Sequence, residues 1–459
     1  MLFCATARMF LRFQSLAAAD PRAAALIDGE RGTIVTRGEL IARAAELAQR
    51  LTASGLRERD ALGVKLPNSV DLVAVILAAL HLRLILVPID RDANESEVAS
   101  ILGHFAVKGL AYRSDRDTTS FSTRAVSERP LVPDDAVLIK LTSGSTGKPK
   151  GIVTTEANLL ADCTNICTTM DIRATDINLG AIPFSHSYGF SNLVTPLFTQ
   201  GTALVISNDY LPQSLIDLAN QHGCTVAPLI PMVFEHLTNA AHGTFESVRT
   251  FLSAGAPLPP STSRRFRERF GAPIHSFYGC SECGGITYDR AGAAVERGTV
   301  GTPLGGVTLA LERGRLTVHS ESVAAGYLFD AATFTPFTNG AFTTDDLVEL
   351  RADGEVALTG RAGDLINTAG KKVNPREVEA VLLQLEGVRE AKVYGEAAGA
   401  RGEVVAAAIV ATPNVTREQV REFCRARLSA HKVPRIVKLI EELPVDERGK
   451  VRRSALATL

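Results

Sequence analysis

Short apolar segments that alternate with amphipathic ones are the feature that most restricts how this chain can fold. Six runs are rich in β-branched or aliphatic residues and are bounded by Gly, Pro or Asp, which is typical of buried strands. They lie at residues 61–67, 84–90, 136–142, 201–207, 224–230 and 248–255. Between them lie segments with helical periodicity, such as residues 38–51 and 212–223. The alternation predicts an α/β fold in which mostly parallel sheets are covered by helices.

A different pattern begins near residue 360. Asn374 has the character of a helix N-cap, Pro375 suits the first helical position, and Glu377 stands where it would close a capping box. Gly387 is expected to end this helix. Its apolar residues fall on one face: Val378, Val381, Leu382 and Leu385.

The C-terminal part then continues as a compact α+β unit. Strand-like runs at residues 388–395 and 404–412 precede a second helix, which Thr416 and Gln419 cap, and a last strand-like run at 435–441. We therefore expect a large N-terminal domain over residues 1–360 and a small, mobile α+β C-terminal domain over residues 361–459. The glycines at the boundary favour a hinge over a rigid join: Gly360, Gly363 and Gly370.

Composition excludes several classes of protein. The 459 residues are 46% hydrophobic and carry a formal net charge of −1, which fits neither a disordered tail protein nor a polybasic nucleic-acid binder. No apolar run approaches the roughly 20 residues that cross a bilayer. Arg8 and Arg12 precede the first acid, Asp20, so a transit peptide is conceivable, but Arg12 interrupts any secretory apolar core. We expect a cytoplasmic globular protein.

The strongest local motif is LTSGSTGKPKG, residues 141–151, directly after a strand-like run. Small residues let backbone N–H groups converge on an anion, hydroxyls add donors, and lysines add positive charge. The spacing differs from that of the Walker P-loop, and a flexible Ser/Gly linker is the alternative that the flanking strands disfavour. The motif predicts a polyphosphate site made by Thr142, Ser143, Gly144, Ser145, Thr146, Gly147 and Lys148.

Six further motifs follow in a fixed order: PFSHSYG (183–189), SAGAPLP (253–259), YGCSE (278–282), FTTDDL (342–347), GRAGDLINTAGKKVNPREVE (360–379) and LPVDERGKVRR (443–453). Together with the phosphate-loop motif, the set resembles the adenylate-forming superfamily of acyl-CoA synthetases, nonribosomal-peptide adenylation domains and beetle luciferases. The resemblance runs from about residue 25 to the C-terminus. It implies that a carboxylic acid and ATP give acyl-AMP and pyrophosphate, and that a thiol then displaces AMP.

The resemblance implies a role for individual residues. Lys450 resembles the catalytic cation at the carboxylate and α-phosphate, and Glu282 the catalytic acid that binds Mg²⁺. Asp346 and Arg361 resemble the residues that hold the ribose hydroxyls. The remaining ATP-binding residues implied are Ala254, Gly255, Ala256, Tyr278, Gly279 and Ser281.

The acyl site is implied by the PFSHSYG motif and by the apolar run near residue 231. His186 is a catalytic candidate there, expected to act as pocket wall and gate rather than as a general base. The other expected pocket residues are Ser187, Tyr188, Gly189, Pro231 and Met232. Residues 183–191 contain no acid to pair with an α-ammonium group, which argues against an amino acid and for a fatty or aromatic carboxylate. The segment INTAGKKVNP inclines us to a fatty acid.

The hinge motif implies rotation about Asp364 after adenylation, with ATP bound in a cleft between the domains. A tunnel for the thiol is then expected along Gly370, Lys371 and Lys372. Two departures from the family pattern stand out. Asp345 replaces the usual glycine beside Asp346, which is unfavourable near a nucleotide unless it points outward. Gly363 replaces a frequent lysine and should ease rotation.

Three alternatives stay open. The thiol is that of CoA or of a phosphopantetheinyl acyl-carrier protein, because both present the same arm. A non-catalytic nucleotide-binding homologue is disfavoured, since Lys450, Glu282 and Asp346 are all present. Cys280 and Cys283 fit a CxxC motif, but without a second such pair we expect packing rather than zinc or redox chemistry.

Overall fold

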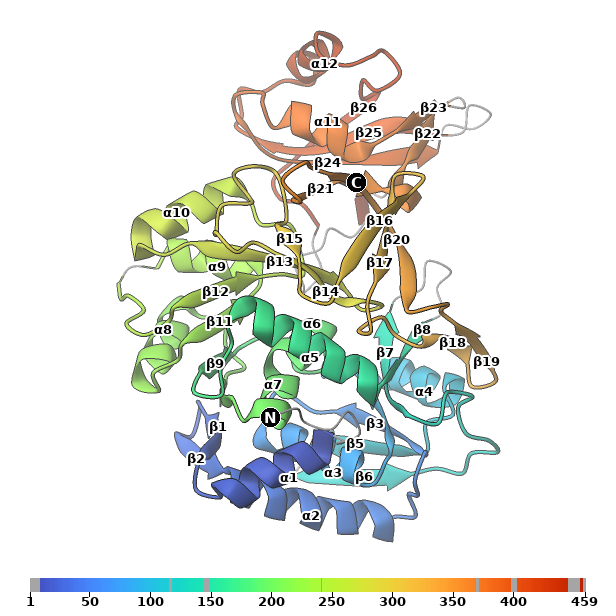
Figure 1. The fold of residues 1–459 in the computed structure, drawn as a ribbon. Helices are drawn as coiled ribbons and strands as arrows, with labels where there is room; N and C mark the ends of the chain where they lie inside the picture. The colour runs from blue at the N-terminus through green and yellow to red at the C-terminus, as the bar shows by residue number, and fades with distance from the viewer. Residues whose placement is uncertain are drawn as a thin grey trace. The chain divides into compact units, whose positions relative to one another are not determined.

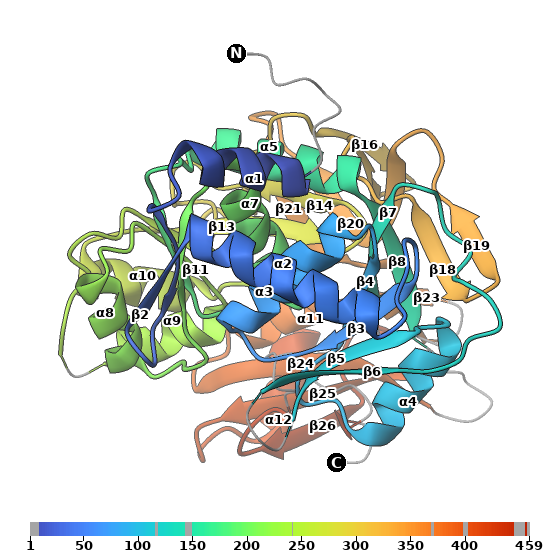
Figure 2. The same cartoon turned by 90° about the horizontal axis from the view of Figure 1, so that it is seen from below.

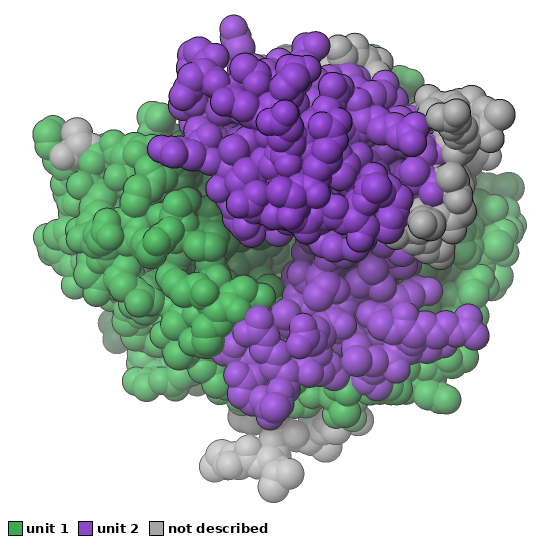
Figure 3. Space-filling view, turned by 90° about the horizontal axis from the view of Figure 1, so that it is seen from above, with its two compact units in different colours: residues 1–309, 318–342 green, residues 310–317, 343–459 purple. Residues whose placement is uncertain are grey.

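The computed structural model describes residues 9–114, 118–142, 149–240, 242–368, 371–397, 403–444 and 455–456. The chain forms two compact units, residues 1–309 with 318–342 and residues 310–317 with 343–459, coloured separately in Figure 3. The functional boundary expected near residue 360 stays a prediction. In the described part of the chain, no helix combines the length and apolar character needed to span a membrane. The cytoplasmic location expected above also stays a prediction.

The first unit contains a nine-stranded sheet whose central strands are parallel and whose edges are antiparallel (Figure 1). Its order is β15 (Thr302–Pro303), β14 (Gly284–Tyr288), β13 (Ile274–Cys280), β12 (Thr250–Ser253), β11 (Val226–Leu229), β9 (Ile177–Gly180), β10 (Ala203–Ile206), β1 (Ala24–Asp28) and β2 (Thr33–Thr36).

An eight-stranded sheet is the second layer of this unit. Strands β7, β4, β3 and β5 are parallel, and antiparallel strands flank them. The order is β19 (Thr333–Pro336), β18 (Gly326–Asp330), β8 (Lys150–Thr155), β7 (Ala136–Thr142), β4 (Ile85–Pro88), β3 (Ala61–Lys65), β5 (Gly109–Arg113) and β6 (Thr119–Thr123).

Helices cover both sheets, and α1, α2 and α3 lie close together in Figure 2. The helices are α1 (Met9–Ala19), α2 (Arg37–Ala53), α3 (Val70–His81), α4 (Glu95–His104), α5 (Glu156–Met170), α6 (Ser187–Gly189), the π-helix η1 (Phe190–Val194), α7 (Thr195–Gln200), α8 (Pro212–Gln221), α9 (Pro231–Thr238) and α10 (Pro260–Phe270).

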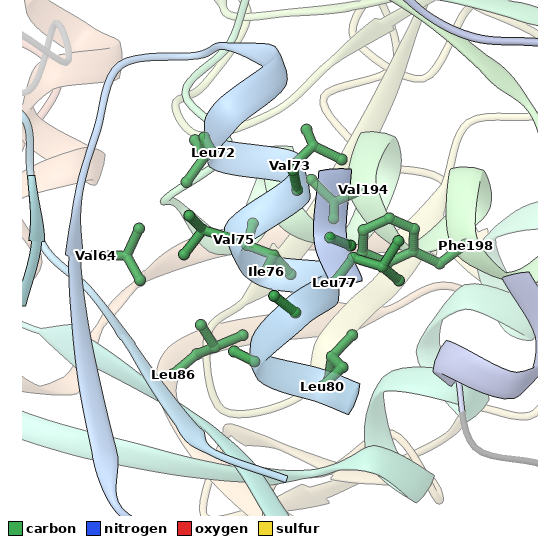
Figure 4. Packing of buried hydrophobic residues seen from close by; sticks show 14 of the residues in the cluster. Val64, Leu72, Val73, Val75, Ile76, Leu77, Leu80, Leu86, Val194 and Phe198 are labelled. Atoms are coloured by element: carbon green, nitrogen blue, oxygen red, sulfur yellow. The ribbon is translucent and has the colours of Figure 1, made fainter. Parts of the chain in front are cut away.

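Helix α3 occupies the centre of the largest hydrophobic core. It is apolar all round, which is typical of a helix buried between layers. Val64 of β3 and Leu86 of β4 pack on one side of α3, and Val194 and Phe198 pack on the other (Figure 4). Because the core also includes residues of β1 and β10, it joins the two sheets through this helix.

The second unit contains most of a four-stranded sheet, a three-stranded sheet and a β-hairpin. The strands β16 (Thr308–Glu312), β17 (Arg315–His319), β20 (Ala341–Leu350) and β21 (Val356–Arg361) form one sheet, and β24 (Val388–Ala397), β25 (Glu403–Ala411) and β26 (Ile436–Ile440) form the other. The 3₁₀ turn η2 (Ala362–Asp364) precedes the hairpin of β22 (Ile366–Thr368) and β23 (Lys371–Val373). Helices α11 (Pro375–Leu382) and α12 (Arg417–Arg425) pack beside the three-stranded sheet.

The α/β architecture is confirmed, with a large sheet-and-helix unit and a small α+β unit, and each of the six strand-like runs contains a strand. Two details of the helix at 375 were predicted wrongly. Asn374 caps it as expected, but Glu377 closes no capping box, because its carboxylate binds the Lys432 ammonium at 2.5 Å instead. The helix ends at Leu382, and Gly387 lies in the turn that follows, with a φ of 90°.

Candidate functional site

The predicted polyphosphate loop connects two antiparallel strands of the first unit. Thr142 ends β7 and Lys150 begins β8, and these two residues are direct partners in the ladder. Strand β7 is buried over its first five residues, and its end is paired with β8, so the start and end of the loop are fixed by the sheet. Six of the predicted phosphate-binding residues lie outside the described part of the chain: Ser143, Gly144, Ser145, Thr146, Gly147 and Lys148.

Glu282 lies in the turn that joins β13 to β14, at the edge of the nine-stranded sheet. The register of the two strands shifts between Tyr278 and Gly279, a bulge that bends the chain just before the turn. Two hydrogen bonds hold the backbone of the turn, at Glu282 itself and at the residue that follows it. The carbonyl of Glu282 accepts a hydrogen bond from the Ala324 amide at 2.8 Å, and the carbonyl of Cys283 accepts one from Ser322 Oγ at 2.8 Å.

The Glu282 side chain is linked to the end of the phosphate-loop motif. The hydroxyl of Tyr327, on β18, donates a 2.8 Å hydrogen bond to Glu282 Oε1. The Lys150 ammonium lies over the same Tyr327 ring, 5.3 Å from its centroid, and 5.5 Å from that of Phe329. One tyrosine therefore contacts both the predicted Mg²⁺ ligand and Lys150, near the end of the phosphate-loop motif.

The acyl motif contacts the Glu282 turn directly. Ser187, the first residue of α6, donates a 2.8 Å hydrogen bond from its Oγ to the Oγ of Ser281. Gly189 packs so closely on the preceding turn that a Cβ there would lie 2.1 Å from the Pro183 oxygen. Two motifs almost a hundred residues apart in the chain are therefore brought together.

Tyr188 lies behind this contact, against Phe277 at a centroid separation of 5.9 Å. Its hydroxyl donates to the Leu252 carbonyl at 3.1 Å and lies 3.4 Å from the Leu229 carbonyl, so it bridges the ends of β12 and β11. Burial raises the pKa of this phenol well above its usual value. Tyr188 is thus a fixed neutral donor. The expected wall residues Pro231, which is buried, and Met232, which is half-buried, begin α9 just beyond β11.

His186 is the N-cap of α6, but its side chain makes no capping hydrogen bond. Its Nε2 lies 3.8 Å from Asp90 Oδ2, beyond the end of β4, and both side chains are about one-third exposed. This position fits a gate or wall better than a free general base.

The expected adenine-side turn follows β12 directly. Ala254 is buried, Gly255 is exposed and Ala256 is half-buried. The Oγ of the preceding Ser253 is buried and has no hydrogen-bond partner within the described ranges. Such an atom at the edge of a predicted nucleotide site is a free polar group for a ligand.

In the second unit, Asp346 and Arg361 are opposite each other on β20 and β21. Arg361 Nε donates to Asp346 Oδ1 at 2.7 Å, and Asp346 is 5% exposed. Asp345, one residue earlier, points the other way: it is exposed and lies 3.1 Å from Arg315 Nη2. The extra carboxylate therefore faces away from Asp346, as a nucleotide site would require.

The other expected residues of this unit are described only in part. Asp364 is half-buried at the end of η2. Gly370 and Lys450 lie outside the described residues, as do the side chains of Lys371 and Lys372. Their predicted roles in the thiol tunnel and in adenylation stay predictions.

Two buried charged residues contact the Glu282 turn, and the sequence patterns did not identify either of them as a site residue. Lys140 on β7 is 8% exposed and Asp162 on α5 is 3% exposed. Burial raises the pKa of Asp162, opposed by the charge of Lys140 and by hydrogen bonds from Ser191 and Gly285. Burial lowers the pKa of Lys140, and the charge of Asp162 is the largest opposing influence. The signal was available, since Lys140 interrupts an apolar strand and Asp162 falls on the buried face of its helix.

The described residues fit MgATP in their chemistry. Mg²⁺ prefers few protein carboxylates together with phosphate oxygens and water. Glu282 is a half-buried carboxylate of which only Oε1 has a hydrogen-bond partner in the described part of the chain. Glu282 would hold the ion, which would draw charge from the phosphate oxygens.

Comparison with known proteins identifies the family. Residues 13–328 match the family described as AMP-binding enzyme, and residues 377–450 match the AMP-binding enzyme C-terminal domain. The sulfoacetate–CoA ligase of Cupriavidus necator is 28% identical over 477 residues, which covers 94% of each chain. The long-chain-fatty-acid–CoA ligase FadD13 of Mycobacterium tuberculosis is 26% identical and covers 96% of each chain. ATP-bound MatB from Rhodopseudomonas palustris shares the fold, with a TM-score of 0.84 at 23% identity over 98% of each chain. The chain therefore belongs to the AMP-binding enzyme family, and its curated relatives include acyl-CoA ligases.

Proposed function

We propose that this protein activates a fatty or aromatic carboxylic acid with ATP and Mg²⁺, forming acyl-AMP and pyrophosphate, and then transfers the acyl group to CoA. The observation that carries the proposal is the contact of Tyr327 with both Glu282 and Lys150. It joins the predicted Mg²⁺ ligand to one end of the predicted polyphosphate loop within one unit of the fold.

In the adenylation step, the carboxylate of the substrate must approach a triphosphate that repels it. Positioning and neutralisation of charge supply most of the catalysis in such a reaction. Glu282 would hold Mg²⁺ at the phosphates, Asp346 and Arg361 would bind the ribose, and Lys450 would supply the cation at the α-phosphate.

In the second step, the domain of residues 361–459 would rotate about Asp364 relative to residues 1–360. Lys450 would then leave the reacting centre, and Gly370, Lys371 and Lys372 would line the path of the thiol. Gly363 supports this assignment, because an exposed glycine beside the pivot accepts a wide range of backbone angles.

The acid is proposed from the residues around Ser187 and Tyr188. No carboxylate occurs between Pro183 and Ser191 to pair with an ammonium group. The relatives named above act on acids as different as sulfoacetate and long-chain fatty acids. A fatty acid is our first choice and an aromatic acid our second.

The experiment is a panel of carboxylates scored for ATP-dependent AMP release, with CoA, with a phosphopantetheinylated carrier protein, and without thiol. Acid-dependent exchange of pyrophosphate into ATP tests the first step alone. Failure of exchange with every acid would favour a non-catalytic nucleotide-binding protein. AMP release with the carrier protein but not with CoA would show that the carrier protein, not CoA, is the acceptor.

A further inference from the structure

The turn of residues 280–285 rests on two buried charged side chains that come from other elements. From β7, the Lys140 ammonium donates to the Ser281 carbonyl at 3.3 Å. From α5, Asp162 Oδ1 accepts from the Gly285 amide at 2.9 Å. The two contacts lie on either side of Glu282, which is the predicted Mg²⁺ ligand.

Contact between Asp162 and the turn is unusually close. Gly284 has a φ of 73°, and a Cβ there would lie 2.3 Å from Asp162 Oδ1 and 2.5 Å from its Cγ. Only glycine combines this backbone conformation with that approach. The turn and the carboxylate therefore have complementary shapes that a side chain at residue 284 would destroy.

A buried lysine and a buried aspartate are expensive to retain. Each loses its hydration, and neither would be kept ionised without an opposite charge nearby. Hydrophobic residues would fill both positions at lower cost, because β7 and the inner face of α5 are otherwise largely apolar. The simplest explanation is that both charged side chains form polar contacts that are needed at this place.

We propose that Lys140 and Asp162 are positioning residues that fix the backbone of residues 281–285, and with it the carboxylate of Glu282. Neither side chain touches the nucleotide in this role. The inference rests on the proposed function, because the value of a fixed Glu282 lies in binding MgATP.

The test uses three variants of the full chain: Lys140→Met, Asp162→Asn and the double variant. Lys108→Met is the matched control. Lys108 also pairs with a buried carboxylate, that of Asp60 at 2.6 Å, but just before β5 and β3 rather than under the turn. Three quantities are measured: the melting temperature, the affinity for ATP with and without Mg²⁺ by titration calorimetry, and KM for MgATP against KM for the acid.

Each single variant should melt at a lower temperature, because it removes a hydrogen bond to the turn and leaves the opposite buried charge uncompensated. The double variant should bind MgATP about tenfold more weakly, since the fixed turn is lost, with a KM for the acid close to that of the wild type. Lys108→Met should lower the melting temperature but leave the affinity for MgATP and both KM values unchanged.

One outcome would overturn the inference: a double variant that binds MgATP as the wild type does. Failure of the proposed function is distinguishable, because the wild-type chain itself would then neither bind MgATP nor release AMP.

Discussion

The hydroxyl of Tyr327 donates a hydrogen bond to Glu282 Oε1 at 2.8 Å, while the ring of the same tyrosine carries the ammonium of Lys150 on its face. Strand β18, next to the edge strand β19 of the eight-stranded sheet, thereby orients a carboxylate in a turn of the other large sheet. A hydrogen bond to a charged group stabilises it by roughly 1.5–3 kcal/mol.

Tyr327→Phe should keep the aromatic face for Lys150 and remove the hydrogen bond to Glu282. We expect kcat/KM for MgATP to fall about tenfold and the Mg²⁺ concentration for half-maximal rate to rise. Initial rates of AMP release over a Mg²⁺ series measure both. Tyr112→Phe, on β5, is the control and should match the wild type. An unchanged Mg²⁺ requirement in Tyr327→Phe would argue against Glu282 as the metal ligand.

Asp345 and Asp346 form a natural matched pair. Asp346→Asn removes a buried carboxylate that accepts from Arg361, and should weaken ATP binding about tenfold or more. Asp345→Asn removes an exposed carboxylate near Arg315 and should leave the dissociation constant within about twofold. Titration calorimetry with ATP compares them. Equal losses in both variants would mean that the ribose lies elsewhere.

Lys450→Ala should separate the two half-reactions. Pyrophosphate exchange should fall by about two orders of magnitude or more, because the cation at the α-phosphate is lost. Transfer from synthetic acyl-AMP to CoA should remain close to the wild-type rate. A similar decrease in both steps would contradict the assignment of Lys450 to adenylation.

Asp364→Pro restricts the proposed pivot, because proline fixes φ near −65°. One half-reaction should survive and the complete turnover should be lost. Asp364→Ala is the control and should retain turnover. Asp353→Pro is less suitable, because this exposed residue lies in a separate turn. Normal turnover by Asp364→Pro would remove the pivot from this position.

Asp60 offers a prediction about stability and pH. Burial acts to raise the pKa of this carboxyl, but hydrogen bonds from Lys108, Arg129 and the Arg57 amide together outweigh it, and the pKa is lowered. The resulting stability is present above the carboxyl's unfolded pKa, about 3.9, and is lost as the pH falls through the lowered value. Asp60→Asn should therefore cost roughly 3 kcal/mol at pH 7 and less in acid.

Urea unfolding at pH 7 and at pH 3 checks this difference. Asp134→Asn is the control, because that carboxylate pairs with Arg59 but is 98% exposed, and its loss should change stability by about 0.5 kcal/mol or less. A cost for Asp60→Asn that is equal at both pH values would show that its charge does not contribute.

Local sequence patterns predicted the strands and the unit architecture well, because apolar runs and caps act over a few residues. Glu377 shows where such patterns fail: the capping-box spacing was correct, but Lys432, 55 residues away, binds its carboxylate. Contacts across long sequence separations were also out of reach. No local rule pairs Lys140 with Ser281, or Tyr327 with Glu282, although a lysine inside an apolar strand could have prompted the question.

Tyr188 ties together parts of the fold that an engineer would prefer to alter separately. Its hydroxyl bridges the ends of β11 and β12, and these strands lead respectively to Pro231 and to the turn at Ala254. If Tyr188 borders the acyl pocket and the turn at Ala254 borders adenine, as proposed, replacing this tyrosine to broaden the range of accepted acids should also weaken ATP binding. Substitutions at the proposed pocket residue Met232, which is on α9 and takes no part in that bridge, should change acid specificity without this loss of ATP binding.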